Sequence, residues 1–219
     1  DLIYAGGDDL LIIMNAKAAL TFCQRCITLV AEQFAFSRRL TDGTGYRTCT
    51  YNTVTLSCGV AIADTKFPIY FLLDKAREME KEAKKAFREK ITTDNLNLLD
   101  LPAGSVACTA VQGAMPSAEK TCFVLPDDLA DYGILLDIIR DSLGEDTRPV
   151  IRDLVTCGTS AEERLNFIKY NYASALRKQG EAGRRIEIAS MMAEVVNNHR
   201  IHNATKMIIP LLWHQGGED

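Results

Sequence analysis

The sequence predicts an α+β fold in which a sheet domain over residues 1–115 precedes an α-helical domain over residues 125–219. Two apolar runs of strand length surround a Gly-Gly-Asp-Asp tip in residues 2–13, which is the pattern of a β-hairpin. A strand pattern over residues 53–63 then leads into a long helical pattern. From Leu125 onward helical patterns follow one another without a return to period-two alternation. These three observations define the predicted division of the chain.

The predicted hairpin over residues 2–13 has apolar arms, which we expect to be largely buried, and a polar tip that should face solvent. Gly6 and Gly7 have no Cβ, so a bulky ligand such as a nucleotide can approach the backbone there. Asp8 and Asp9 place two carboxylates side by side, and carboxylates are the donors that Mg²⁺ or Mn²⁺ prefers. The alternative is a solvated turn, because Gly and Asp are ordinary turn residues.

Helical and strand patterns alternate after the hairpin. Apolar residues at helical spacing predict a helix over residues 16–36, with Asn15 as its N-cap. Residues 50–63 are rich in β-formers, and Gly59 among them indicates a close approach of a helix or a ligand to that strand. A helix over residues 68–90, with a proline in its first turn, follows. This order of elements is that of the second half of a ferredoxin-like palm.

The remainder of the chain is predicted to contain one more strand and then helices. Residues 104–111 predict a last short strand that closes the sheet. Residues 126–128 open the first of the helices, and Ser160 with Glu163 forms a capping box for another. A small basic cluster is either a solvated loop or a surface that faces RNA or a neighbouring subunit. The cluster consists of Arg177, Lys178, Arg184 and Arg185.

Length and composition set limits on the class of protein. A chain of 219 residues can hold one large or two small domains, each with its own core. The net charge of −4 does not indicate general nucleic-acid binding, so any such contact must be local or made by partner chains. Seven cysteines without disulfide-framework spacing, and no secretory segment, predict a cytoplasmic location. No run approaches the roughly 20 apolar residues of a membrane span, so no membrane partner is expected.

Two pairs of residues have the spacing of metal ligands. Cys23 and Cys26 form a C-x-x-C, and His199 and His202 lie one helical turn apart. In neither case does the sequence place a second pair or an acidic partner to complete a ligand set. We therefore expect structural thiols and structural or exposed histidines.

Three stretches together resemble a known family: Tyr4–Leu11, which contains Gly-Gly-Asp-Asp, Leu56–Ala63 and Pro68–Lys84. They are similar to the cyclase palm of the large subunit of type III CRISPR effector complexes. The similarity covers about residues 1–112, and the helical remainder matches the order of that subunit's C-terminal domain more loosely. Diguanylate cyclases share the palm, but their motif has Glu-Phe after the first acidic residue, whereas Leu10 follows the second aspartate here.

The resemblance implies a nucleotidyltransferase that joins ATP through 3′–5′ bonds into cyclic oligoadenylates. Asp8 and Asp9 would be catalytic and would hold a pair of divalent ions, Mg²⁺ or Mn²⁺. Gly6 and Gly7 would let the ribose and the phosphates of ATP approach the hairpin tip. The palm would be incomplete here, because its first strand, from which relatives supply a further acidic residue, is not among the stretches that match.

Two further residues are candidates for nucleotide binding through the same resemblance. Ser57, in the strand that faces the nucleotide in the family, would contact the base or the ribose, and the alternative is a serine satisfied within the sheet. Lys84, late in the long helix, would contact the phosphates. Lys85 is the substitute for this role, and a solvated lysine is the alternative.

The resemblance also implies partners. They are the other subunits of the type III complex, its guide RNA and its target RNA, and an upstream segment of the same polypeptide that carries the first palm strand. We expect residues 1–219 alone to be catalytically silent and poorly soluble, because unpaired strand edges of this apolarity are prone to aggregate. The alternatives are a non-catalytic scaffold module of the ribonucleoprotein and a signalling enzyme like the diguanylate cyclases.

Overall fold

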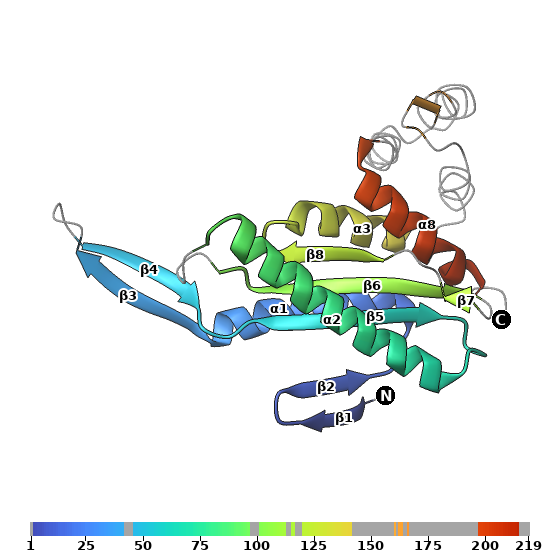
Figure 1. The fold of residues 1–219 in the computed structure, drawn as a ribbon, viewed down its shortest axis with the longest axis horizontal. Coiled ribbons are helices and arrows are strands. Elements are labelled where there is room, and N and C mark those ends of the chain that lie inside the picture. The colour runs from blue at the N-terminus through green and yellow to red at the C-terminus, as the bar shows by residue number, and fades with distance from the viewer. Residues whose placement is uncertain are drawn as a thin grey trace.

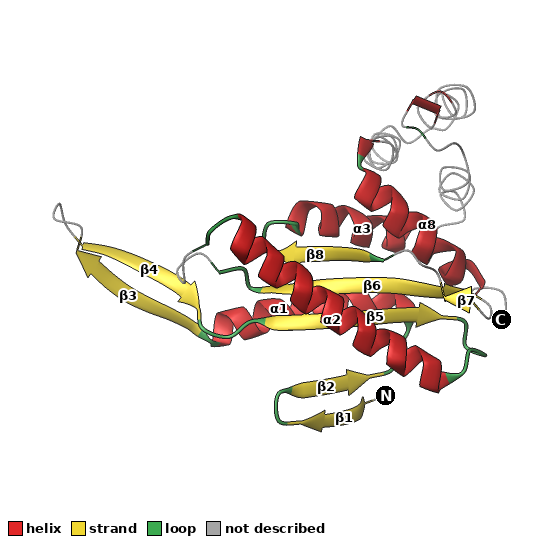
Figure 2. Cartoon of the chain, viewed as in Figure 1, coloured by secondary structure: helices red, strands yellow, loops and turns green. Residues whose placement is uncertain are grey.

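The computed structural model shows strands and helices mixed along the chain (Figures 1 and 2), which confirms the predicted α+β class. No helix among the described residues is long and apolar enough to cross a membrane. The predicted basic cluster at residues 177–185 lies outside the described part of the chain. The structure describes residues 2–41, 46–96, 101–112, 115–116, 120–141, 160, 162–163, 166 and 197–214.

The first element is the predicted hairpin. Strand β1 (Leu2–Gly6) pairs antiparallel with β2 (Asp9–Ile12), and the two form a sheet of their own. The expectation of largely buried arms is wrong for three side chains: Ile3, Tyr4 and Leu10 are each about half exposed. The reason is that neither strand pairs with the larger sheet in the described part of the chain, so the hairpin gains no cover from it.

Helix α1 (Ala16–Gln33) follows the hairpin. Asn15 caps it as predicted, since Asn15 Oδ1 accepts a hydrogen bond from the backbone N–H of Lys17 at 3.0 Å. The helix ends three residues earlier than predicted. The N–H of Phe34, the C-cap residue, still bonds to the carbonyl of Val30 at 3.0 Å. The helical spacing of apolar residues therefore continues past Gln33, and the sequence pattern does not reveal the end of the helix.

A second hairpin, which the sequence analysis missed, comes next. Strand β3 (Ala35–Thr41) pairs antiparallel with β4 (Tyr46–Asn52), and Figure 1 shows this hairpin projecting away from the rest of the molecule. The side-chain hydroxyl of Thr53 donates to the carbonyl of Phe34 at 2.6 Å and closes its base. The predicted strand over residues 50–63 is thus two strands that belong to different sheets.

Strand β5 (Leu56–Ala63) and helix α2 (Ile69–Thr93) approach each other backbone to backbone at Gly59. A Cβ on Gly59 would overlap the carbonyl oxygen of Ala76 and the backbone nitrogen of Glu80. Glycine is therefore required by the close packing of the helix on the strand. The close approach predicted at Gly59 is confirmed, and the neighbour is a helix.

The largest sheet is built around β6 (Gly104–Gln112), the strand predicted at residues 104–111. Strand β5 runs parallel to β6, connected to it through α2, which crosses one face of the sheet (Figure 1). The other edge of β6 pairs antiparallel with the short β7 (Met115–Pro116) and with β8 (Thr121–Leu125). Strand β8 was not predicted, because the helical patterns that follow begin directly at its end.

Helices α3 (Leu129–Asp141) and α8 (His199–His214) share one hydrophobic core with α1 and the large sheet. A separate, smaller cluster fills the side of the sheet under α2. The expectation that the C-terminal helices have a core of their own is therefore wrong for α3 and α8. The division at residues 115–125 stays a prediction, because most residues between these helices lie outside the described part of the chain. The shared core includes Leu20, Ile27, Val60, Phe123, Tyr132, Leu135, Ile201 and Ile208.

Tyr132 joins α3 to two other elements of this core. Its hydroxyl donates a hydrogen bond to the carbonyl of Leu20 in α1 at 2.6 Å. Its ring meets the ring of Phe123 in β8 edge to face, with centroids 5.2 Å apart. The side chain is fully buried, so this hydrogen bond satisfies two polar groups that water does not reach.

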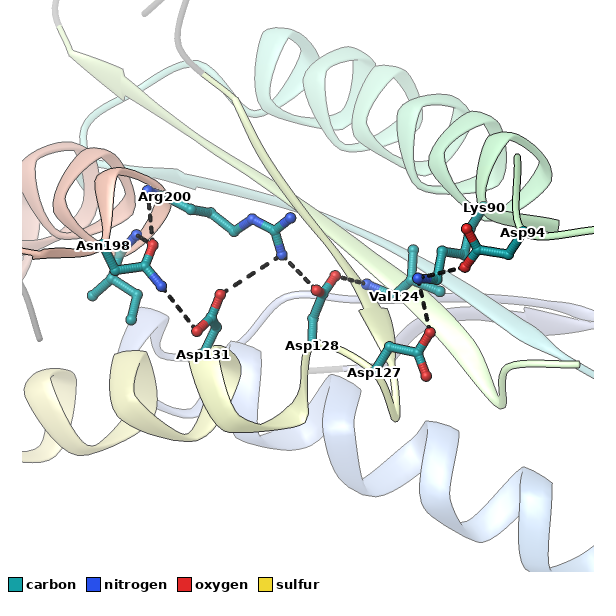
Figure 3. Close-up of polar contacts among 9 residues, drawn as sticks. Lys90, Asp94, Val124, Asp127, Asp128, Asp131, Asn198 and Arg200 are labelled. Atoms are coloured by element: carbon teal, nitrogen blue, oxygen red, sulfur yellow. Dashed lines mark hydrogen bonds and ion pairs between the residues drawn. The ribbon is translucent and has the colours of Figure 1, made fainter. Parts of the chain in front are cut away.

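A polar network ties the first turn of α8 to α3 and β8 (Figure 3). Arg200 Nη1 lies 2.7 Å from Asp128 Oδ1, and the second oxygen of Asp128 accepts the N–H of Val124 at 2.7 Å. Asn198 donates to Asp131 at 2.9 Å. These contacts hold α8 beside residues that are about seventy positions away in sequence.

A neighbouring ion pair links this region to the end of α2 (Figure 3). Lys90 Nζ lies 2.7 Å from a carboxylate oxygen of Asp94 and 3.0 Å from one of Asp127. Both carboxylates are partly exposed, so solvent screens each pair and its contribution to stability is small. The pairs orient the end of α2 toward the turn between β8 and α3.

The predicted capping box is also present. The N–H of Glu163 bonds to the Ser160 hydroxyl oxygen, and the N–H of Ser160 bonds to the Glu163 carboxylate, both at 3.2 Å. A local sequence signal therefore gave the local geometry even where much of the surrounding segment lies outside the described residues.

We expect Gly59→Ala to lower the free energy of unfolding by about 1–3 kcal/mol, the usual effect of overpacking. The added methyl meets backbone atoms of α2, which cannot move aside as a flexible side chain can. Gly133→Ala in α3 is the matched control, because no atom lies within 4 Å of its added Cβ. It should stabilise the helix by about 0.5–1 kcal/mol. Urea denaturation measures both changes, and a Gly59→Ala chain as stable as the parent would contradict this packing.

We expect Tyr132→Phe to lower the free energy of unfolding by about 1–2 kcal/mol, because the carbonyl of Leu20 is left buried without its donor. Tyr70→Phe is the control, since Tyr70 is 79% exposed. The measurement is denaturation followed by both fluorescence and circular dichroism. If α3 unfolded separately from the sheet, the two probes would give different midpoints, and the shared core would be refuted.

Candidate functional site

The Gly-Gly-Asp-Asp tip is a two-residue hairpin turn. Gly6 and Asp9 are the closing pair of the strands, and Gly7 and Asp8 occupy the turn itself. Gly7 has a φ of 62°, in the left-handed region. Positive φ at the first central position is characteristic of the II′ turn, which places glycine there. The backbone of the turn therefore depends on Gly7.

The two glycines of the tip have different surroundings. A Cβ on Gly6 would meet the phenol ring of Tyr4, whose side chain lies over this position. No atom lies within 4 Å of a Cβ built on Gly7, so its surface is open. Gly7 is thus the glycine at which a ligand can reach the backbone directly, whereas Tyr4 must move before a ligand reaches Gly6. Their predicted role in nucleotide binding stays a prediction.

The carboxylates of Asp8 and Asp9 are exposed at the tip. Mg²⁺ is usually bound through one or two carboxylates together with substrate phosphates, and seldom by a cage of protein ligands alone. The two aspartates therefore fit the role of the protein ligands in such a site. Within the described ranges, no group of three or more His, Cys, Asp or Glu side chains comes together to hold a metal.

Lys84 of α2 lies close enough to the tip for the two aspartates to act on its charge. Its Nζ is 2.5 Å from Glu80 Oε1, and its side chain is 51% exposed. The Glu80 carboxylate raises the pKa of Lys84 above its usual value, and Asp9 and Asp8 add to this effect. Lys84 is therefore held protonated, within the electrostatic influence of the acidic tip.

Ser57 lies in β5 on the side of the sheet that α2 covers. Its hydroxyl oxygen is 3.2 Å from that of Ser105 in β6, and Ser105 donates to the carbonyl of Ala83 in α2 at 2.9 Å. This chain of hydroxyl groups ends one residue before Lys84. Ser57 thus has a hydrogen-bond partner within the sheet, which is the arrangement expected if Ser57 does not bind the nucleotide. The predicted contact of Ser57 with a base or a ribose stays a prediction.

The structure therefore places Lys84 of α2 within the electrostatic influence of Asp8 and Asp9, which lie in a turn distant in sequence. Two residues of this region were missed by the sequence analysis. Glu80 precedes Lys84 by one helical turn, a spacing that predicts an ion pair. Ser105 carries no local signal, because its two hydrogen-bond partners come from other elements.

Of the two cysteines of the C-x-x-C motif, Cys23 belongs to the hydrophobic core and Cys26 does not. Cys23 is buried and Cys26 half-buried, and both are free thiols. A hydrogen bond between Cys58 and Cys23, together with burial, raises the pKa of Cys58. Burial raises the pKa of Cys108 to about 12. Cys58 and Cys108 therefore stay protonated at neutral pH, which makes them poor nucleophiles and poor metal ligands.

The two paired histidines differ in exposure. His202 is buried in α8, whereas His199 is exposed and its Nε2 lies 3.1 Å from the side-chain amide of Asn203. Both lie in the helix that packs on α3, on the other side of the sheet from α2. They are therefore remote from the acidic tip and from Lys84.

Comparison with known proteins gives one match. Residues 1–92 match the family model described as Cas10/Cmr2, second palm domain. No curated protein and no solved structure was found to match the chain. The matched segment runs from the Gly-Gly-Asp-Asp hairpin through β5 to the last turn of α2, and so contains Asp8, Asp9, Ser57 and Lys84.

The match confirms the resemblance that the motifs indicated. It covers the elements whose order predicted the second half of a palm: the acidic hairpin, a helix, a strand and the long helix α2. Residues 1–92 therefore match the second palm domain of Cas10/Cmr2, and this match supports the resemblance to the large subunit of type III CRISPR effector complexes.

Proposed function

We propose that this chain is the catalytic palm of a nucleotidyltransferase that joins ATP into cyclic oligoadenylates within an RNA-guided type III CRISPR complex. The observation that carries the proposal is the juxtaposition of an intact pair of exposed carboxylates, Asp8 and Asp9, with the protonated Lys84. The carboxylates attract cations and Lys84 attracts phosphates, so the site offers both charges that a nucleoside triphosphate with its metal ions requires.

The proposed reaction is a phosphoryl transfer between two nucleotides. The 3′-hydroxyl oxygen of one ATP attacks the α-phosphorus of another, the bond to the β-phosphate breaks, and pyrophosphate leaves with the electron pair. Mg²⁺ or Mn²⁺ held by Asp8 and Asp9 would activate the hydroxyl and neutralise the leaving group. A last condensation of the 3′ end with the 5′ end of the same molecule closes the ring.

The residues of the chain have separate tasks in this proposal. Asp8 and Asp9 bind the cations at an exposed tip, where a large substrate can reach them. Gly7 leaves its backbone open to the ribose and phosphates. Lys84 offsets the negative charge of the triphosphate, and Glu80, which accepts its hydrogen bond, orients it. Gly6 contacts the nucleotide once the ring of Tyr4 moves away from it. Ser57 contacts the nucleotide once its hydrogen bond to Ser105 is broken.

The partners of the site are also part of the proposal. Strands β2 and β5 each pair on one side only within the described residues, so each offers a free edge to a further strand. We assign this strand to an upstream segment of the same polypeptide, which would also contribute a further acidic residue. The other subunits, the guide RNA and the target RNA would assemble around the palm in the cytoplasm, and target RNA would switch the cyclase on.

We expect Asp8→Asn with Asp9→Asn to reduce ATP condensation by more than about 100-fold, as for other losses of charge at a reacting centre. The exposed tip supports little of the core, so assembly of the complex should be unchanged. Asp137→Asn, which removes an exposed carboxylate from α3, is the control. The measurement is formation of oligoadenylates from ATP by the assembled complex with Mg²⁺ or Mn²⁺. Wild-type product formation by the double variant would show that the tip is not catalytic.

We expect residues 1–219 alone to release no pyrophosphate from ATP and Mn²⁺ above the background of the Asp8→Asn, Asp9→Asn variant. Activity should appear when the upstream segment is supplied, either covalently or as a second chain, because β2 and β5 then gain a strand between their free edges. Pyrophosphate release over time is the readout. Robust release by residues 1–219 alone would show that no further strand is needed, and would leave the assignment of the two aspartates intact.

A further inference from the structure

One side of helix α2 carries a basic stripe that the proposed reaction of two ATP molecules does not require. All five members are exposed to solvent. At 3.6 residues per turn and 1.5 Å per residue, they fall within an arc of roughly 100° and span roughly 16 Å of the helix. The basic stripe consists of Arg77, Lys81, Lys84, Lys85 and Arg88.

The charges of the basic stripe are only partly neutralised by the helix itself. Arg77 lies 3.6 Å from a carboxylate oxygen of Asp74, and Lys85 lies 3.8 Å from one of Glu89, in loose and exposed pairs. Exposed pairs of this kind contribute at most about 1 kcal/mol, so phosphates can replace them. Within the described part of the chain, the side chains of Lys81 and Arg88 form no ion pair.

The basic stripe is continuous with the candidate active site. Lys84 belongs to the stripe and is also the residue on which the charges of Asp8 and Asp9 act. From Lys84 the stripe extends toward Arg88 in one direction and toward Arg77 in the other. A growing product can therefore lie along one arm of the stripe while the triphosphate of the incoming nucleotide lies along the other, so that both arms bind phosphates.

The length of the basic stripe indicates the class of ligand. A stacked single strand carries one phosphate per roughly 3.4 Å, so a stripe of roughly 16 Å faces about five phosphates. The triphosphate of a single ATP is shorter than this. Because the chain as a whole has a net charge of −4, this concentration of cations is local to α2. The ligand that fits is a short linear oligonucleotide with its 5′-triphosphate.

We propose that the basic stripe of α2 retains the linear, 5′-triphosphorylated oligonucleotide that grows at the acidic tip, and so sets how many condensations occur before the product leaves. This inference rests on the proposed function. Each condensation adds one nucleotide and its negative charge, so retention strengthens as the product lengthens along the stripe. Weakening the stripe away from Lys84 therefore affects long products more than short ones.

The test is the double variant Lys81→Gln with Arg88→Gln in the full-length subunit, assembled in its complex. These two residues are chosen because their replacement leaves no carboxylate without a partner. Arg25→Gln with Lys206→Gln is the matched control, since it removes two exposed cations from α1 and α8. Products made from ATP are separated by length. We expect the ratio of products longer than the dinucleotide to the dinucleotide itself to fall at least threefold in the stripe variant, and to stay unchanged in the control.

Binding of a linear 5′-triphosphorylated triadenylate that ends in a 3′-deoxynucleotide gives an independent readout. The slope of log affinity against log salt should fall by about 1.4 in the stripe variant, at about 0.7 for each cation that no longer binds a phosphate. If the wild-type complex makes oligoadenylates, and the stripe variant shows unchanged product lengths and an unchanged salt slope, the inference is overturned. A loss of guide or target RNA from the stripe variant would also overturn it, in favour of an RNA-binding surface. A wild-type complex that makes no oligonucleotide would instead refute the proposed function.

Discussion

The contact of Gly59 with the backbone of α2 is the constraint on which the candidate site depends. A helix can lie this close to a strand only where no Cβ intervenes. Ser105 reinforces the same contact by donating to the carbonyl of Ala83. Together they set the height and direction of α2 above the sheet, and hence where Lys84 stands relative to the hairpin tip. If α2 packed less closely on β5, the position of Lys84 relative to the acidic tip would no longer be fixed.

The charged groups of this palm are distributed unevenly over its surface. The net charge of −4 is small, yet α2 presents five exposed cations on one side and the hairpin presents two adjacent carboxylates. The charges of Asp8 and Asp9 act on Lys84 and contribute to its raised pKa. Carboxylates for metal ions and cations for phosphates are the two halves of a site for a metal–nucleotide complex.

The palm and the described C-terminal helices form a single packed unit. The family match ends at residue 92, whereas the hydrophobic core continues through β6, β8, α3 and α8. Tyr132 bonds to α1, and Arg200 of α8 bonds to Asp128 at the start of α3. Forces on the C-terminal helices therefore reach the sheet that carries α2.

The sequence by itself determined the features that depend on neighbouring residues: the Gly-Gly-Asp-Asp hairpin, the Asn15 cap, the Ser160 capping box and the requirement for glycine at position 59. Each is encoded within a few residues by hydrogen-bonding capacity or by the absence of a side chain. Only the tertiary structure decided that the hairpin arms stay exposed, that residues 35–52 form a separate hairpin, that β8 joins β6, and that α3 and α8 share the core of the sheet. It also decided that the charges of Asp8 and Asp9 act on Lys84. These outcomes depend on pairing and burial between segments far apart in the chain, and no local pattern specifies which distant partner a strand edge or an apolar face will find.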